Sequence, residues 1–96
     1  MTGNEIVQKL RELMPELKNH YGVERIGLFG SFARNDVTEK SDIDILVKLE
    51  DPSFLKLARL LNFLEDTFHK KVDITTQHKY LSPRFVKIIE RDLIYA

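Results

Sequence analysis

Cysteine is absent from the 96-residue chain, and neither acidic nor basic residues are in excess. Without cysteine the chain can form neither a disulfide framework nor a thiolate metal site, which fits a reducing cytoplasm. Lysine plus arginine and aspartate plus glutamate each total 15, so no net positive charge attracts nucleic acid. No apolar run approaches the roughly 20 residues of a membrane helix, and Glu5 and Lys9 lie within the first apolar pattern, unlike in a signal peptide. These absences predict a small soluble protein of the cytoplasm.

Glycine and proline are also scarce, with four and three residues, and no stretch rich in them forms a linker. The chain has no internal repeat and no low-complexity segment that would mark a boundary. Its hydrophobic content of 43% and charged content of 31% are ordinary for a globular protein. A chain of this length supports a single hydrophobic core, so we expect residues 1–96 to form one domain.

Apolar spacing predicts alternating helices and strands. A first helix over residues 4–20 should stop at Gly22, and Pro15 should kink it or start a second short helix. The remaining pattern predicts strands over residues 24–30, 42–50 and 70–76, helices from residue 53 to about 68 and over residues 82–92, and the tail 93–96 as a candidate fourth strand. This order predicts an α/β (α+β) fold, in which a mixed sheet of three to four strands has helices packed on one face.

The predicted strands separate apolar from acidic side chains. Successive residues of a strand point to opposite faces. Asp42 and Asp44 therefore share one face of their strand, and Asp73 lies on the corresponding face of the next strand. The opposite, helix-packed face carries the aliphatic residues Ile26, Leu28, Ile43, Ile45, Val47, Leu49, Val72 and Ile74. Three carboxylates are thus predicted to collect on the side of the sheet that faces away from the helices.

The spacing of Asp42 and Asp44 indicates a metal site. Their β-carbons should lie roughly 6.5–7 Å apart, so both side chains can lean onto two cations about 3.5–4 Å apart, as in enzymes of phosphoryl displacement. Without a cation, two charges about 5 Å apart would repel by roughly 3 kcal/mol at an effective dielectric of about 20. Oxygen ligands without histidine or cysteine favour Mg²⁺ or Mn²⁺ over zinc. The alternative is that Asp-x-Asp simply forms the solvent face of a strand.

Gly30-Ser31 follows a predicted strand and precedes a stretch, residues 32–34, that is short enough for one helical turn. Gly30 would let a phosphate approach the backbone, and Ser31 would offer a hydroxyl and an N–H at the helix N-terminus. Arg34 is a candidate to pair with a triphosphate. Asn35 tolerates the left-handed conformation of a turn. Taken alone, Gly30 could simply turn the chain, Ser31 cap the turn and Arg34 be a surface charge.

Gly-Ser, ten residues and then Asp-x-Asp, with a later Asp on another strand, resemble the nucleotidyltransferase signature of the DNA polymerase beta-like superfamily. The stretch IGLFGSFARNDVTEKSDIDILV (26–47) resembles most closely the minimal nucleotidyltransferases of prokaryotes, the small partners of HEPN-domain toxins. The resemblance covers essentially the whole chain and implies a nucleotidyltransferase (DNA polymerase beta-like palm) fold. One departure is Asn35, where the family commonly has glycine; a left-handed Asn should preserve the turn.

The resemblance implies a role for each matching residue on the nucleotide side. Gly30 and Ser31 match the positions that hold the nucleotide's phosphates. Arg34 and Ser41 are secondary candidates for phosphate contacts. The implied substrate is ATP, although no motif in the sequence marks the choice of base.

The carboxylates carry the implied chemistry. Asp42 and Asp44 match the ligands of two Mg²⁺ ions, for which Mn²⁺ could substitute, and Asp73 matches the third carboxylate, which completes the second metal site and helps deprotonate the attacking hydroxyl. An acceptor hydroxyl would attack the α-phosphate, and magnesium pyrophosphate would leave. Positioning and charge stabilisation are the protein's contribution to such a reaction.

The resemblance also implies a partner. Larger members of the superfamily add a domain that holds the acceptor, for which 96 residues leave no room. The expectation is an antitoxin that transfers AMP to a tyrosine hydroxyl of a HEPN ribonuclease toxin. One alternative is an antitoxin that neutralises the toxin by binding alone. Another is transfer to a small molecule or to an RNA end, and the zero net charge disfavours the RNA end.

Overall fold

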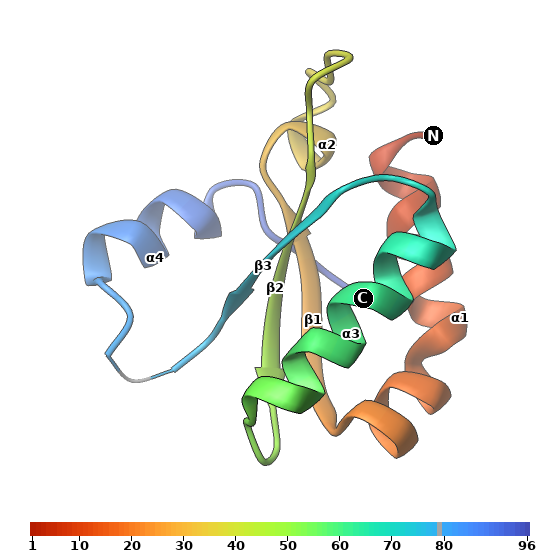
Figure 1. The fold of residues 1–96 in the computed structure, drawn as a ribbon. Coiled ribbons are helices and arrows are strands. Elements are labelled where there is room, and N and C mark those ends of the chain that lie inside the picture. The colour runs from red at the N-terminus through yellow and green to blue at the C-terminus, as the bar shows by residue number, and fades with distance from the viewer. Residues whose placement is uncertain (79) are drawn as a thin grey trace.

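The computed structural model describes residues 1–78 and 80–96 (Figure 1). Helices and strands alternate along the chain, as the apolar spacing predicted. The elements are α1 (Gly3–Tyr21), β1 (Val23–Phe29), α2 (Ser31–Arg34), β2 (Ile43–Leu49), α3 (Phe54–Phe68), β3 (Val72–Thr76), α4 (Pro83–Glu90) and β4 (Ile94–Tyr95).

The strands form one mixed sheet in the order β3-β2-β1-β4. The β1 strand pairs antiparallel with β2 and with β4, whereas β2 and β3 run parallel. The parallel pair requires a crossover, and α3 provides it. The prediction of a mixed sheet with a short fourth strand from the tail is confirmed, and the crossover leaves β3 at an edge of the sheet.

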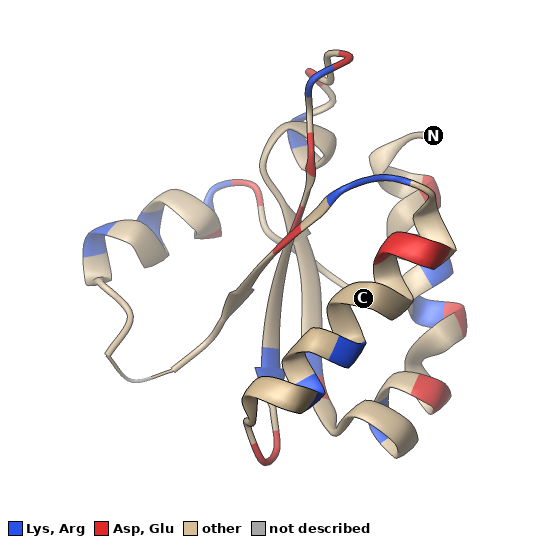
Figure 2. Cartoon of the chain, in the orientation of Figure 1, with Lys and Arg blue, Asp and Glu red and all other residues tan. Residues whose placement is uncertain are grey.

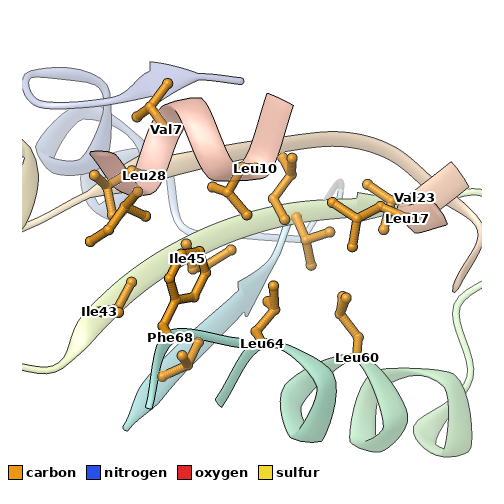
Figure 3. Close-up of a cluster of buried hydrophobic side chains, with 14 of the residues drawn as sticks. Val7, Leu10, Leu17, Val23, Leu28, Ile43, Ile45, Leu60, Leu64 and Phe68 are labelled. Atoms are coloured by element: carbon orange, nitrogen blue, oxygen red, sulfur yellow. The ribbon is translucent and has the colours of Figure 1, made fainter. Parts of the chain in front are cut away.

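The main core lies between the sheet and the two long helices. Figure 3 shows Leu10 of α1 and Leu64 of α3 both directed toward the strand that carries Ile45. The least exposed side chains, each below 2% exposure, are Ile6, Leu10, Leu17, Ile26, Leu28, Ile43, Ile45, Val47, Leu60 and Leu64. The alternation predicted for the strand over 42–50 is confirmed, because its odd-numbered aliphatic residues are buried in this core.

Helix α4 lies on the other side of the sheet from α1 and α3 (Figure 1). The prediction of helices on one face therefore holds for α1 and α3 only. The reason is an apolar residue on the second face. Leu46 lies on the same face of the sheet as Asp44, and α4 covers this part of the face, so that Leu46 and Ile89 of α4 are both buried. Gly27 pairs with Leu46 across the strands, and a β-carbon there would lie only 2.8 Å from Leu93 Cδ1, so a small residue lets this segment pack closely.

Helix α1 is continuous through Pro15, and the predicted second short helix does not form. Proline removes one hydrogen bond of the helix, but Pro15 is exposed, so water can satisfy the freed carbonyl. Buried Leu10 and Leu17 fix the helix on both sides of it. The helix ends at left-handed Gly22 (φ 67°), as predicted. Within residues 1–78 and 80–96, every helix is too short or too polar to serve as a membrane span.

Replacing Pro15 by alanine is expected to raise the free energy of unfolding by about 1–3 kcal/mol. Alanine restores the missing hydrogen bond and removes the clash with the preceding turn. Urea unfolding of Pro15→Ala beside wild type measures the change, with exposed Lys18→Ala on the same helix as the control. A Pro15→Ala protein no more stable than the wild type would contradict this account of α1.

Candidate active site

The turn between β1 and α2 places Gly30 and Ser31 at one end of the sheet. Gly30 has φ 77° and ψ −154°, a combination that is almost confined to glycine. Its carbonyl accepts a hydrogen bond from the N–H of Arg34 (3.0 Å), and Ser31 is the first residue of α2. Asn35 ends the turn in the left-handed conformation (φ 63°, ψ 38°), so the prediction for Asn35 is confirmed.

Asp44 lies directly against Gly30. The antiparallel register pairs Phe29 with Asp44, which brings the aspartate to the end of β1. A β-carbon added to Gly30 would lie 2.9 Å from Cγ and 3.1 Å from Cβ of Asp44, and it would overlap Oδ2. The Asp44 carboxylate thus occupies the space that any side chain at position 30 would need. The phosphate-binding candidate and a metal-binding candidate therefore belong to one site.

Asp42 and Asp73 lie beside Asp44. The parallel register pairs Asp44 with Asp73, and Asp42 immediately precedes β2. Asp42 and Asp44 are half-buried and Asp73 is exposed, so the site is open to solvent. In Figure 2 the acidic segments of β2 and β3 meet below α2. We call Asp42, Asp44 and Asp73 the carboxylate cluster.

The charges of Asp73 and Asp42 act on Asp44. Burial raises the pKa of the Asp44 carboxyl, the negative charges of Asp73 and then Asp42 raise it further, and Arg34 lowers it. The folded state thus holds a carboxylate where its charge is disfavoured, which is the condition that a bound cation relieves. The pairing of Asp44 with Asp73 and the effect of Asp73 and Asp42 on Asp44 agree with the predicted convergence of the three aspartates.

The carboxylate cluster suits Mg²⁺ or Mn²⁺ better than a metal that needs a complete protein cage. Among the residues that the structure describes, no group of three or more His, Cys, Asp or Glu side chains is placed to hold a metal ion, so a role for Asp73 as a metal ligand beside Asp42 and Asp44 stays a prediction. Mg²⁺ is commonly held by one or two carboxylates, with water and substrate phosphates completing its coordination. The hard oxygen donors of Asp42 and Asp44, with the Asp44 carboxylate directly against Gly30, fit that mode of binding.

Arg34 is held by two acidic residues. Its Nε donates to Asp36 Oδ2 (3.2 Å) and its Nη1 donates to Asp92 Oδ2 (2.9 Å). Asp92, just after α4, ties the C-terminal segment to α2, and nothing in its sequence context pointed to this role. Because Arg34 lowers the pKa of Asp44, its charge reaches the cluster. A phosphate contact by Arg34 stays a prediction.

Ser41 shapes the turn that leads into Asp42. Its Oγ accepts a hydrogen bond from the N–H of Thr38 (2.9 Å), and its own N–H donates to the Thr38 carbonyl (3.1 Å). These bonds fix the approach of the chain to the cluster. A phosphate contact by Ser41 also stays a prediction.

Replacing Asp44 by asparagine is expected to stabilise the fold at pH 7 but not at pH 3. A carboxyl whose folded pKa lies above its unfolded value is neutral in both states at low pH. It destabilises the folded state as the pH rises from the unfolded pKa through the raised folded pKa, because the charged form is disfavoured there. Urea unfolding at the two pH values measures the difference between Asp44→Asn and wild type. A difference that does not grow with pH would contradict the raised pKa.

The nucleotidyltransferase domain family has a sequence model that matches residues 8–96. The chain belongs to this family. The match includes every member of the carboxylate cluster and the Gly30-Ser31 turn. The resemblance inferred from the motif is confirmed.

Two relatives match this nucleotidyltransferase chain over nearly its whole length. A Methanocaldococcus jannaschii protein, provisionally named protein adenylyltransferase MJ0126, is 48% identical over 95 residues, which are 98% of this chain and 97% of the relative. Protein adenylyltransferase MntA of Thermococcus cleftensis is 36% identical over an alignment of 97 positions, which covers 100% of this chain and 97% of the relative.

Solved structures share the fold. A provisionally named minimal nucleotidyltransferase aligns with a TM-score of 0.77 at 35% identity, covering 98% of this chain and 95% of that one. A structure of the tri-AMPylated HEPN toxin of Shewanella oneidensis in complex with MNT antitoxin aligns with a TM-score of 0.59 at 22% identity. The alignment covers 97% of this chain and 66% of that one. The predicted nucleotidyltransferase fold is confirmed.

Proposed function

We propose that this nucleotidyltransferase is an antitoxin that transfers AMP from ATP to a tyrosine hydroxyl of a HEPN ribonuclease toxin. The observation that carries the proposal is the 48% identity, over 98% of the chain, to a relative named as a protein adenylyltransferase. The contact of Asp44 with Gly30 supports it, since it joins the metal-binding and phosphate-binding candidates in one site. The same proposal places the protein in the cytoplasm, which the cysteine-free sequence led us to expect.

The residues of the site have separate roles in this reaction. Gly30 and the N–H of Ser31 hold the phosphates, and Asp42 and Asp44 hold Mg²⁺. Bound there, Mg²⁺ would act as a Lewis acid that neutralises negative charge on the phosphates. Asp73, the exposed member of the cluster, lies where an acceptor arriving from solvent can meet it and takes the proton of the attacking hydroxyl.

The reaction forms one bond and breaks one. The tyrosine oxygen bonds to the α-phosphorus of ATP while the bond from that phosphorus to the bridging oxygen of the β-phosphate breaks. Pyrophosphate leaves with that oxygen, and the tyrosine proton passes to Asp73 and then to solvent. The rate depends on holding the hydroxyl in line with the leaving pyrophosphate.

The openness of the site supports a protein acceptor. Asp73 and Arg34 are exposed and Asp42 and Asp44 are only half-buried, so a second protein can reach the cluster. The equal numbers of acidic and basic residues give no net charge for binding nucleic acid. We expect the toxin to be encoded by the adjacent gene and to form a complex with this chain.

Incubation with that HEPN-domain toxin, Mg²⁺ and ATP labelled at the α-phosphate tests the proposal. We expect label on a toxin tyrosine, identified by mass spectrometry, and no label when ATP is labelled at the γ-phosphate. A stable complex in which the toxin stays unlabelled would contradict AMP transfer. Label on a small molecule or an RNA end in place of the toxin would contradict the assigned acceptor.

A further inference from the structure

The outer edge of β3 is oriented for pairing with another strand. The carbonyl of Lys71 accepts from Ile43 N, and Gln77 N donates to the Val47 carbonyl, so the odd-numbered residues direct their backbone groups to β2. Backbone groups alternate sides along a strand. The N–H and carbonyl groups of Ile74 and Thr76 therefore point outward, away from β2. Such an edge can accept an extended segment of another chain.

Glu65 closes the same edge at its beginning. Its Oε2 accepts a hydrogen bond from the outward N–H of Val72 (3.0 Å). A segment that pairs with Ile74 and Thr76 therefore cannot continue past Val72 with a full ladder. It has to leave the edge beside Asp73.

An apolar groove accompanies this edge. A cavity of about 260 Å³ is lined by Phe54, Leu57, Ala58 and Leu61 of α3 and by residues 72–74 of β3. A neighbouring cavity of about 310 Å³ shares Phe54 and Leu57 and extends to Thr76. Phe54, which lines both cavities, is 88% exposed and therefore accessible to a partner. We call the two cavities together the β3 edge groove.

We propose that the β3 edge groove seats an extended segment of the toxin that carries the acceptor tyrosine. The inference rests on the proposed function, because the acceptor has to reach the carboxylate cluster. Asp73 lines the groove and belongs to the cluster, so the edge of β3 at this residue connects the groove, on the α3 side of the sheet, with the cluster on the opposite face. A segment that leaves the edge beside Asp73 is brought to the proposed base, which is where an acceptor tyrosine has to arrive.

Recognition in this arrangement has two parts. Backbone hydrogen bonds to Ile74 and Thr76 fix the direction and register of the segment, whatever its sequence. Apolar side chains on alternate residues of the segment fill the groove against Phe54 and Leu57. The segment leaves the edge at Val72, because the outward N–H of Val72 already donates to Glu65. The tyrosine, which lies beyond that point, reaches the face of the sheet that carries Asp44.

Adjacent exposed residues of α3 provide a matched pair of variants. Phe54 lines the groove, whereas Leu55, 60% exposed, lines neither cavity. Phe54→Lys is expected to raise the KM for the toxin about tenfold, the loss expected from one large apolar contact, while the KM for ATP serves as internal control. Leu55→Lys should leave both constants within about twofold of wild type. Equal effects of the two substitutions on the KM for the toxin would overturn the proposal.

Amide hydrogen exchange tests docking without turnover. The Asp42→Asn/Asp44→Asn protein is mixed with the toxin, and we expect slower exchange at Ile74 and Thr76 in the complex. Unchanged exchange at both amides would overturn the proposal. Slower exchange at these amides when the concentration of this chain is raised without toxin would also overturn it, because it would indicate a second copy on the edge. A wild type that labels the toxin while these readouts fail would leave the proposed function standing. A wild type that does not label the toxin would contradict the function itself.

Discussion

Replacing Asp42 and Asp44 together by asparagine is expected to lower AMP transfer at least about a thousandfold. Asparagine keeps the shape of each side chain but removes the two charges that would hold Mg²⁺, and with them the stabilisation of charge on the phosphates. The fold should survive, since Asp42 and Asp44 are half-buried and their repulsion from Asp73 is relieved. Initial rates of label transfer measure the loss, and thermal unfolding checks the fold.

The control for this double variant is Asp51→Asn/Asp66→Asn, which removes two exposed carboxylates elsewhere. It should transfer AMP at the wild-type rate. The same pair of proteins separates catalysis from masking, because an antitoxin that acts by binding alone would still neutralise the toxin without Asp42 and Asp44. Full neutralisation by the Asp42→Asn/Asp44→Asn protein would therefore contradict the enzymatic account.

Replacing Gly30 by alanine is expected to abolish detectable transfer and to lower the free energy of unfolding by about 1–3 kcal/mol. The new β-carbon would overlap Oδ2 of Asp44, and alanine strongly disfavours φ 77° with ψ −154°. The carboxylate would have to move or the turn would have to rearrange, and either change would separate Asp44 from the proposed phosphate site at Gly30 and Ser31. Transfer rates and urea unfolding measure the two effects.

Gly22→Ala separates backbone strain from damage to the site. Gly22 also has a positive φ (67°), but a β-carbon there would meet only the end of the Lys56 side chain, at 3.9 Å. We expect a loss of about 1 kcal/mol in unfolding free energy with unchanged transfer. Equal transfer by the Gly30→Ala and wild-type proteins would contradict the role assigned to the Gly30–Asp44 contact.

The local features of the site were predictable because they depend on short-range patterns. Alternation along residues 42–49 placed the odd-numbered aliphatic side chains on the core and Asp44 on the other face. The conformation of Asn35 followed from the tolerance of asparagine for left-handed geometry. The shared face of Asp44 and Asp73 followed from the same alternation, applied to two strands that turned out to be neighbours.

Contacts between distant segments were not predictable from such patterns. The contact of Asp44 with Gly30 depends on the register between β1 and β2, which no local signal reports. Asp92 meets Arg34 only because the chain returns to α2 after α4. The packing of α4 on the second face of the sheet became evident only from the burial of Leu46. Pro15 was expected to interrupt a helix that packing on both sides keeps continuous.

Paramagnetic broadening by Mn²⁺ in the presence of ATP tests the central claim most directly, because it locates the metal nucleotide without requiring an acceptor. In the NMR spectrum of the wild type, sub-stoichiometric Mn²⁺ should first broaden the amide signals of Gly30, Ser31, Asp44 and Asp73. The Asp42→Asn/Asp44→Asn protein should lose this selectivity. Selective broadening at another acidic segment, such as Glu50 and Asp51, with Gly30 and Asp44 unaffected, would contradict a metal-nucleotide site at the carboxylate cluster.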